Sequence, residues 1–158
     1  MATVAAALDP AELAAWIAFI QAASRGLQQL DRELLAAHDL SLADYEILVF
    51  LSEADEHRLP MSELATRALV SKSRLTYRVD RLVERGLVER RRCEADARRV
   101  WAMITDAGVE ALTDAWATHV DGVRRYVVGP ISPTDLDAVQ RAMEAMVAAL
   151  DADDREPL

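Results

Sequence analysis

The chain has 158 residues, of which 52% are hydrophobic and one is a cysteine. This length suits one compact domain with a full core. No run reaches the ~18 apolar residues of a membrane span, and the alanine-rich start lacks the basic region of a signal peptide. A single cysteine excludes an internal disulfide framework and fits a reducing compartment. We therefore expect a cytoplasmic protein with no membrane partner.

The net charge of −9 is distributed unevenly. Residues 1–60 and 102–158 each carry a net charge of −7, whereas residues 61–101 carry 11 Lys+Arg against 6 Asp+Glu, a net charge of +5. An acidic protein with one basic segment directs a polyanion to one surface.

The first predicted helix begins at Asp9-Pro10, with aspartate as N-cap and proline at the first helical position, and extends to about residue 37. One face is apolar at helical spacing. Trp16 and Phe19 flank that face, and two interpretations stay open: they belong to a core or interface, or they line a small-molecule pocket.

A capping-box pattern at Ser41 predicts a second helix to about residue 54, with its buried side chains supplied by Tyr45, Leu48, Val49 and Leu51. A polar loop at 55–60 and a short helix at 62–69 follow. A tight turn then leads to a helix from Ser71 to Arg85. Two helices joined by a short turn have the spacing of a helix-turn-helix motif.

The helix at 71–85 is predicted to be the recognition helix. Ser71 is a good N-cap, and Gly86 suits the position after the helix. Leu75, Val79 and Leu82 form its apolar face. A neighbouring stripe holds four arginines, and each such like-charge pair destabilises a helix by roughly 0.2–0.5 kcal/mol. We infer that a polyanion offsets this repulsion; the stripe is Arg74, Arg78, Arg81 and Arg85.

Two short strands are predicted at 87–92 and 98–104, because apolar and other residues alternate in the second of them. A helix-turn-helix followed by a basic hairpin is a winged helix-turn-helix. The predicted fold class is therefore mainly α with a small β-wing.

Two more helices are predicted after the wing. Thr105 caps the first, which extends to about residue 128, and Ser132-Pro133 begins the second. With the first helix of the chain, they are long, alanine-rich and apolar on one face. A separate monomeric core is one interpretation. A dimer interface is favoured, because one winged helix-turn-helix contacts only one half-site of a DNA operator, and two half-sites need two copies. We expect residues 1–38 and 105–158 to supply dimerisation helices and residues 39–104 the DNA-binding region.

The candidate DNA-binding residues fall into three groups. Ser73, Arg74, Tyr77 and Arg78 lie on the exposed N-terminal half of the recognition helix, where base edges are reached. Lys72, Thr76 and Arg81 suit phosphate contacts. Wing arginines supply sequence-independent charge, unless some of them only pair with Glu89 or Glu94; they are Arg90, Arg91, Arg92 and Arg99.

Several motifs together resemble the multiple antibiotic resistance regulator (MarR) family over roughly residues 10–150. They are Ser62-Glu-Leu-Ala65, Val70-Ser71, Val79-Asp80-Arg81-Leu82, Arg85-Gly86-Leu87-Val88, and the wing pattern Asp96-x-Arg98, Val100, Ile104-Thr105 and Gly108. The resemblance implies a homodimer with one winged helix-turn-helix per subunit. It also implies a pseudo-palindromic double-stranded DNA operator and, often, release by a small ligand. Lys72 departs from the family pattern, where proline is common.

The same resemblance implies that Arg98, at the wing tip, inserts into the minor groove. Asp96, two residues earlier, is expected to hold Arg98 or the turn in place. Family members that sense peroxides use a cysteine in the first helix, whereas the cysteine here is Cys93 in the wing. Cys93 is either a thiol sensor, favoured by three flanking arginines, or an ordinary turn residue.

A small aromatic ligand, with an anion among the options, is expected near Trp16, Ile20 and Tyr45. The histidines are scattered without metal-ligand spacing, and neither a glycine-rich phosphate loop nor a nucleophile beside a base is present. We therefore expect no cofactor, no metal site and no enzymatic activity.

The sequence thus predicts a ligand-responsive dimeric repressor. Two alternatives stay open: a winged-helix module that binds a protein partner, and a regulator switched by oxidation of Cys93.

Overall fold

The computed structural model describes residues 8–92 and 99–153. The helices are α1 (Pro10–His38), α2 (Leu42–Glu53), α3 (Met61–Arg67), α4 (Lys72–Glu84), α5 (Asp106–Val123) and α6 (Leu136–Asp153). The strands are β1 (Arg58–Pro60), β2 (Val88–Arg92) and β3 (Val100–Ile104). A 3-10 turn, η1 (Asp55–His57), precedes β1, and a π-helical turn, η2 (Arg124–Val128), continues α5. The predicted fold class, mainly α with a small β-wing, is confirmed.

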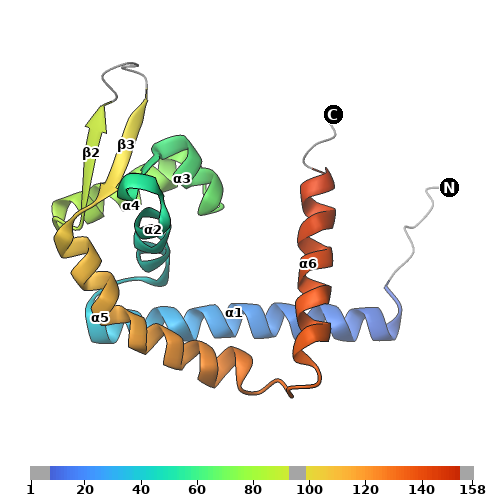
Figure 1. Ribbon diagram of the computed structural model, residues 1–158. Coiled ribbons are helices and arrows are strands. Elements are labelled where there is room, and N and C mark those ends of the chain that lie inside the picture. The colour runs from blue at the N-terminus through green and yellow to red at the C-terminus, as the bar shows by residue number, and fades with distance from the viewer. Residues whose placement is uncertain (1–7, 93–98, 154–158) are drawn as a thin grey trace.

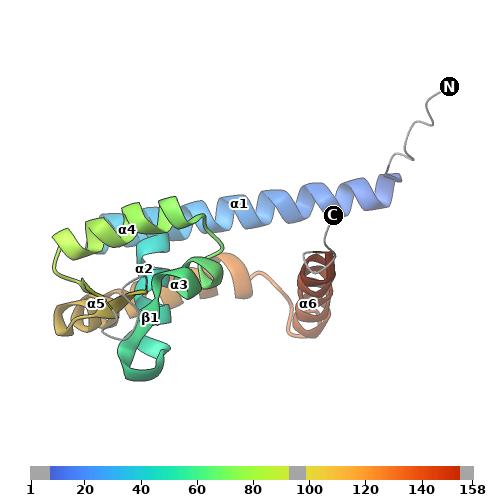
Figure 2. The same cartoon turned by 90° about the horizontal axis from the view of Figure 1, so that it is seen from above.

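Helices α1 and α5 form a long base that carries the winged helix-turn-helix at one end. We call this unit, which consists of α2, α3, α4 and the three-stranded sheet, the reading head. α1 and α5 lie along each other, and α2, α3, α4 and the sheet gather over the C-terminal end of α1 (Figure 1). α6 lies on the side of the N-terminal half of α1 and away from the reading head in both views, although Figure 2 shows a gap between the α6 and α1 ribbons (Figures 1 and 2). The β2–β3 hairpin projects from the head as the wing (Figure 1).

Side-chain caps explain where the helices begin. The Asp9 carboxylate accepts hydrogen bonds from the amides of Ala11 and Glu12. The Glu12 carboxylate in turn accepts one from the Asp9 amide, which completes a capping box. Ser41, Ser71 and Thr105 cap α2, α4 and α5. The expected starts of these four helices are confirmed, and Gly86 ends α4 with a φ of +72°.

The sheet has three antiparallel strands in the order β1-β3-β2. β2 pairs with β3 from Val88 opposite Ile104 to Arg92 opposite Val100. The two expected wing strands are therefore confirmed over the described residues. The segment 55–60, expected to be a polar loop, instead contains η1 and β1, with Leu59 opposite Ala102 on β3. Three residues are too few for an alternation of apolar and polar side chains to predict a strand, and the partner strand β3 lies more than forty residues away in the sequence.

The core lies inside the reading head and at its junction with α1 and α5. Its largest fully buried side chains come from α1, α2, α3, α4 and β2, together with Leu40 of the α1–α2 connection; they are Leu34, Leu40, Tyr45, Ile47, Leu48, Leu51, Leu64, Leu75, Val79, Leu82 and Val88. The apolar face expected for the recognition helix is thus buried as expected.

The end of the wing is locked onto the turn after α4. The Thr105 hydroxyl donates to the Gly86 carbonyl at 2.7 Å, and the Thr105 amide donates to the Leu87 carbonyl at 3.1 Å. A Cβ on Gly108 would overlap the Leu87 carbonyl oxygen and the Ile104 side chain. This close backbone approach is a physical reason for the Ile104-Thr105 and Gly108 pattern.

α6 and the first half of α1 contribute nothing to this core. Every described side chain of α6 is exposed, and α1 has no buried residue before Leu30. α6 also begins later than expected, at Leu136, because residues 133–135 form a turn in which the Asp135 and Leu136 amides both bond to the Ser132 carbonyl. Within the described residues, no helix combines the length and the apolarity needed to cross a membrane.

Candidate nucleic-acid interface

The face of α4 opposite the core is exposed and mostly polar. Leu75, Val79 and Leu82 turn inward, so helical geometry places Ser73 and Tyr77 on the far side. Tyr77 is 65% exposed. Lys72, Arg74, Thr76 and Arg81 are also exposed. The predicted reading and phosphate-contacting residues of α4 therefore share one accessible surface, with Arg78 at its half-buried edge.

The arginines of α4 differ in whether a carboxylate holds them. Arg78 Nη1 lies 3.5 Å from Asp44 Oδ1 on α2, and Arg85 Nη2 lies 3.7 Å from Asp39 Oδ2 after α1. Among the described residues, no carboxylate lies within ion-pair distance of Arg74 or Arg81. Arg74 and Arg81 can therefore donate to a phosphate or base without first breaking an ion pair.

Arg90 joins the wing to the recognition helix. Its Nη1 lies 2.7 Å from Asp80 Oδ1, and its Nη2 donates to the Thr76 carbonyl at 2.9 Å. Both partners belong to α4, so this predicted DNA contact is engaged within the protein. The sequence suggested Glu89 or Glu94 as intramolecular partners of the wing arginines, and Glu89 does pair with Arg91 at 3.1 Å.

Arg92 and Arg99 are exposed at the ends of the two wing strands. Lys72, Thr76, Arg90 and Arg99 line one cavity of about 350 Å³ between α4 and the wing, together with residues from the start of α3. Cys93, Asp96 and Arg98 lie outside the described residues, so the roles expected for them stay predictions.

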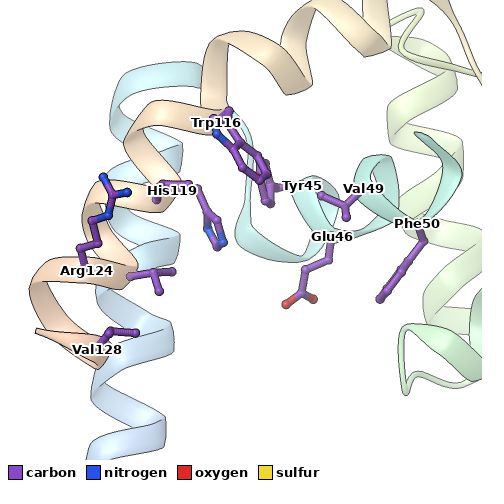
Figure 3. Close-up of a pocket in the computed structure, with 10 residues that line it drawn as sticks. Tyr45, Glu46, Val49, Phe50, Trp116, His119, Arg124 and Val128 are labelled. Carbon is purple, nitrogen blue, oxygen red and sulfur yellow. The ribbon is translucent and has the colours of Figure 1, made fainter. Parts of the chain in front are cut away.

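A second hollow lies between α2 on one side and α5 with η2 on the other (Figure 3). This cavity of about 490 Å³ is lined mainly by apolar and aromatic side chains: Tyr45, Glu46, Val49, Phe50, Trp116, His119, Val120, Val123, Arg124 and Val128. The Tyr45 and His119 rings lie 4.5 Å apart between centroids, tilted by 31°. We refer to it as the α2–α5 pocket.

Two polar atoms in the wall of the α2–α5 pocket are buried without a hydrogen-bond partner in the described structure. They are the Tyr45 hydroxyl and His119 Nδ1. Burial raises the pKa of the Tyr45 phenol and lowers the pKa of the His119 imidazole. Burial also raises the pKa of the Glu46 carboxyl, against the nearby charge of Arg78. Buried polar groups are normally paired, so these two atoms are the unpaired polar part of an otherwise apolar pocket wall.

Only one of the three predicted ligand-binding residues lines this pocket. Tyr45 does, whereas Trp16 and Ile20 lie on the exposed first half of α1, where Trp16 is 53% exposed and neighbours Phe19. Trp116 and His119 line the same pocket as Tyr45, and the ligand contacts expected for Trp16 and Ile20 stay predictions. Trp116 and His119 belong to α5, and the helical periodicity of one segment does not show which distant helix it packs against.

The described residues contain no group of three or more His, Cys, Asp or Glu side chains placed to hold a metal ion.

The comparisons with known proteins agree with this geometry. The model of the MarR family matches residues 38–99. AbsC, a MarR family transcriptional regulator from Streptomyces coelicolor, is 34% identical, with a TM-score of 0.87 over 93% of this chain and 99% of that chain. The chain belongs to the MarR family.

Two further relatives are informative. Sco3205, a MarR family regulator from Streptomyces coelicolor solved in complex with DNA, is 34% identical, with a TM-score of 0.87 over 91% of this chain and 94% of that chain. The transcriptional repressor YetL of Bacillus subtilis is 31% identical over 96 residues, 61% of this chain. That match spans 58% of YetL itself, less than two thirds of its length.

Proposed function

We propose that this MarR-family protein is a transcriptional regulator, and specifically a repressor, that binds a pseudo-palindromic double-stranded DNA operator as a homodimer. The observation that carries the proposal is the exposed arginine face of α4 beside a basic wing, in a protein whose other segments are acidic. The winged-helix relative solved with DNA supports it. The proposal includes a cytoplasmic location, where operator DNA is found, and no enzymatic role.

The homodimer follows from the apolar surface of the terminal helices. α6 exposes one stripe of Leu136, Val139, Met143, Met146, Val147 and Leu150, and α1 exposes Leu13, Trp16, Ile17, Ile20 and Leu27. Continuous apolar surfaces of this kind normally mark interaction sites. A second copy of the chain is the proposed occupant, because two reading heads are needed for two half-sites. Residues 1–38 and 105–158 thereby act as the dimerisation segments.

The α2–α5 pocket is the proposed effector site. Its aromatic walls suit a ring, and the Tyr45 hydroxyl and His119 Nδ1 suit one polar substituent. Glu46 and Arg124 both line this pocket and carry opposite charges. An uncharged hydroxyaromatic compound is the proposed ligand, and its anionic counterpart is the alternative that the titration separates. In the dimer, Trp16 and Ile20 would belong to the subunit interface, and their role there stays a prediction.

Selection of bound duplexes from random-sequence DNA tests the proposal, with affinities measured by fluorescence anisotropy. The wild type should enrich a site with two half-sites centred ~10–10.5 bp apart. With six to ten phosphates contacted, affinity should fall ~10³–10⁵-fold between about 50 and 200 mM salt. A salt-independent affinity or the absence of any enriched site would contradict DNA reading.

Two arginine variants separate base reading from general attraction. Arg74→Ala should relax base preference at one position per half-site, because a guanine contact contributes ~1–3 kcal/mol of discrimination. Arg91→Ala, in the wing, should weaken selected and random duplexes alike. Equal losses on both duplexes for the two variants would show that α4 does not read bases.

The effector site is tested by fluorescence titration with 4-hydroxybenzaldehyde and its anionic counterpart 4-hydroxybenzoate. The uncharged compound should change the tryptophan emission and weaken DNA binding, and Trp116→Phe should abolish the emission change. A response to neither compound, or an identical response in Trp116→Phe, would count against this pocket.

A further inference from the structure

Asp44 is an unusual residue for its position. Among the described residues, it is the one charged side chain that is buried, at 5% exposure, and it lies in the first turn of α2. Its carboxylate lies 3.5 Å from Nη1 of Arg78, whose side chain is 35% exposed. A carboxylate removed from water is strongly disfavoured unless a partner compensates its charge. Asp44 therefore ties a half-buried arginine of the recognition helix to α2.

Arg78 lies at the boundary between the buried and the exposed faces of α4. Helical geometry puts Arg78 between the buried face of Leu75 and Val79 and the exposed face of Arg74 and Arg81. Ser41 and Asp44 of the α2 start line a cavity of about 480 Å³ with five side chains of α4: Ser73, Arg74, Tyr77, Arg78 and Arg81. Asp44 thus lies at the floor of the surface that is proposed to read DNA.

We propose that Asp44 is a positioning residue for DNA reading: it fixes the guanidinium of Arg78 at the edge of the α4 surface before DNA binds. The inference rests on the proposed function and names a specificity determinant within it. A guanidinium carries five N–H groups, and Asp44 lies near one nitrogen, so the others can donate to a base edge. An arginine already held in place loses less rotamer entropy on contact.

The test compares two affinities for Asp44→Asn, which keeps the side-chain size but removes the charge. One duplex is the sequence that the wild type selects from random DNA, and the other is a random-sequence duplex of equal length. The ratio of the two affinities should fall about tenfold, within the range that one bidentate arginine–base contact contributes. Affinity for random DNA should stay the same or increase, because Arg78 becomes free to meet phosphates.

Base-preference profiles make the role specific. Asp44→Asn and Arg78→Ala should flatten the same position of each half-site, and the double variant should lose no more than Arg78→Ala alone. Glu89→Gln is the matched control, since it removes one carboxylate from an exposed arginine pair in the wing. It should leave the affinity ratio unchanged, which separates positioning from a mere change in net charge.

An unchanged affinity ratio in a folded Asp44→Asn protein would overturn the proposal, whether both affinities fell together or rose together. If Asp44→Asn lowers the thermal midpoint too far for measurement, Arg78→Lys keeps the charge opposite Asp44 but lacks the planar fork. That variant should show the same flattened position, and a wild-type profile from it would equally overturn the proposal. A wild type that selects no DNA would instead overturn the proposed function.

Discussion

Gly108 is the single residue whose replacement gives the clearest test of the packing. It lies in the first turn of α5, where Ala should stabilise a helix by about 1 kcal/mol relative to Gly. A Cβ there would overlap the Leu87 carbonyl oxygen, so Gly108→Ala should instead lower the free energy of unfolding by about 2 kcal/mol. Urea denaturation followed by circular dichroism measures the change.

Gly26→Ala is the control for that prediction. Gly26 is also inside a helix, but its added Cβ would meet only Val127 Cγ2 at an ordinary 3.9 Å. The free energy of unfolding should therefore rise by roughly 0.5–1 kcal/mol. Effects of the same sign at both glycines would contradict the close approach between Gly108 and Leu87.

His119 should make the stability depend on pH. Burial lowers the pKa of its imidazole below the usual 6.5, so the folded protein binds a proton less readily than the unfolded chain. The free energy of unfolding should therefore decrease as the pH falls below about 6.5, by at most ~1.4 kcal/mol per pH unit for one proton. In His119→Phe this part of the decrease should disappear, and an identical pH profile would exclude His119 as its source.

The sequence predicts single residues well where one helix decides their environment. Ser73, Arg74 and Tyr77 were expected on the exposed face of α4, and helical periodicity is enough to place them there. Arg90 was harder, because its partners Asp80 and Thr76 come from another element. The α2–α5 pocket was missed for the same reason: Tyr45 and His119 meet only after α2 and α5 have packed.

At the scale of elements, one side chain of β2 links the wing to α4. Arg90 makes both connections, to the Asp80 carboxylate and to the Thr76 carbonyl. Arg90→Ala should lower the free energy of unfolding by about 1 kcal/mol, since Asp80 is half-exposed and the pair is partly screened. Amide hydrogen exchange in β2 should become faster, because the strand loses its tether to α4.

Arg91→Ala is the matched control on the same strand. Arg91 pairs with Glu89, and both side chains are more than half exposed. The thermal midpoint and the exchange rates of β2 should therefore stay near wild-type values. If Arg91→Ala changed β2 as much as Arg90→Ala does, the tether to α4 would not be what holds the wing.

Element boundaries were predictable where a side-chain cap or a glycine marks them. Ser41, Ser71, Thr105 and Gly86 each mark a helix end that local chemistry decides. β1 was not predictable, because three residues become a strand only through pairing with β3. The start of α6 was placed early because Pro133 suits a first helical position, whereas Ser132 instead directs a turn.

At the scale of the whole molecule, α6 raises a question of stability. Most of the stability of a helix in a protein comes from packing its apolar face against another element. α6 has 18 residues, and none of its side chains whose burial is described is buried, although six apolar residues share one of its faces. Its helical form is therefore explained best if that face packs against a second copy of the chain, as the proposed homodimer requires.

Met143→Glu tests this explanation, because Met143 lies in the middle of the exposed apolar stripe. A carboxylate buried in an apolar interface without a partner is strongly disfavoured. The dissociation constant of the dimer, measured by sedimentation velocity, should therefore rise at least tenfold. Helix content should fall at the same time, since α6 loses its packing. Ala148→Glu places the same charge on the opposite face of α6 and should leave the dimer intact. If the Met143→Glu protein had the sedimentation coefficient and the helix content, measured by circular dichroism, of the wild type, another surface than α6 would join the subunits. The apolar stripe would then serve a different partner.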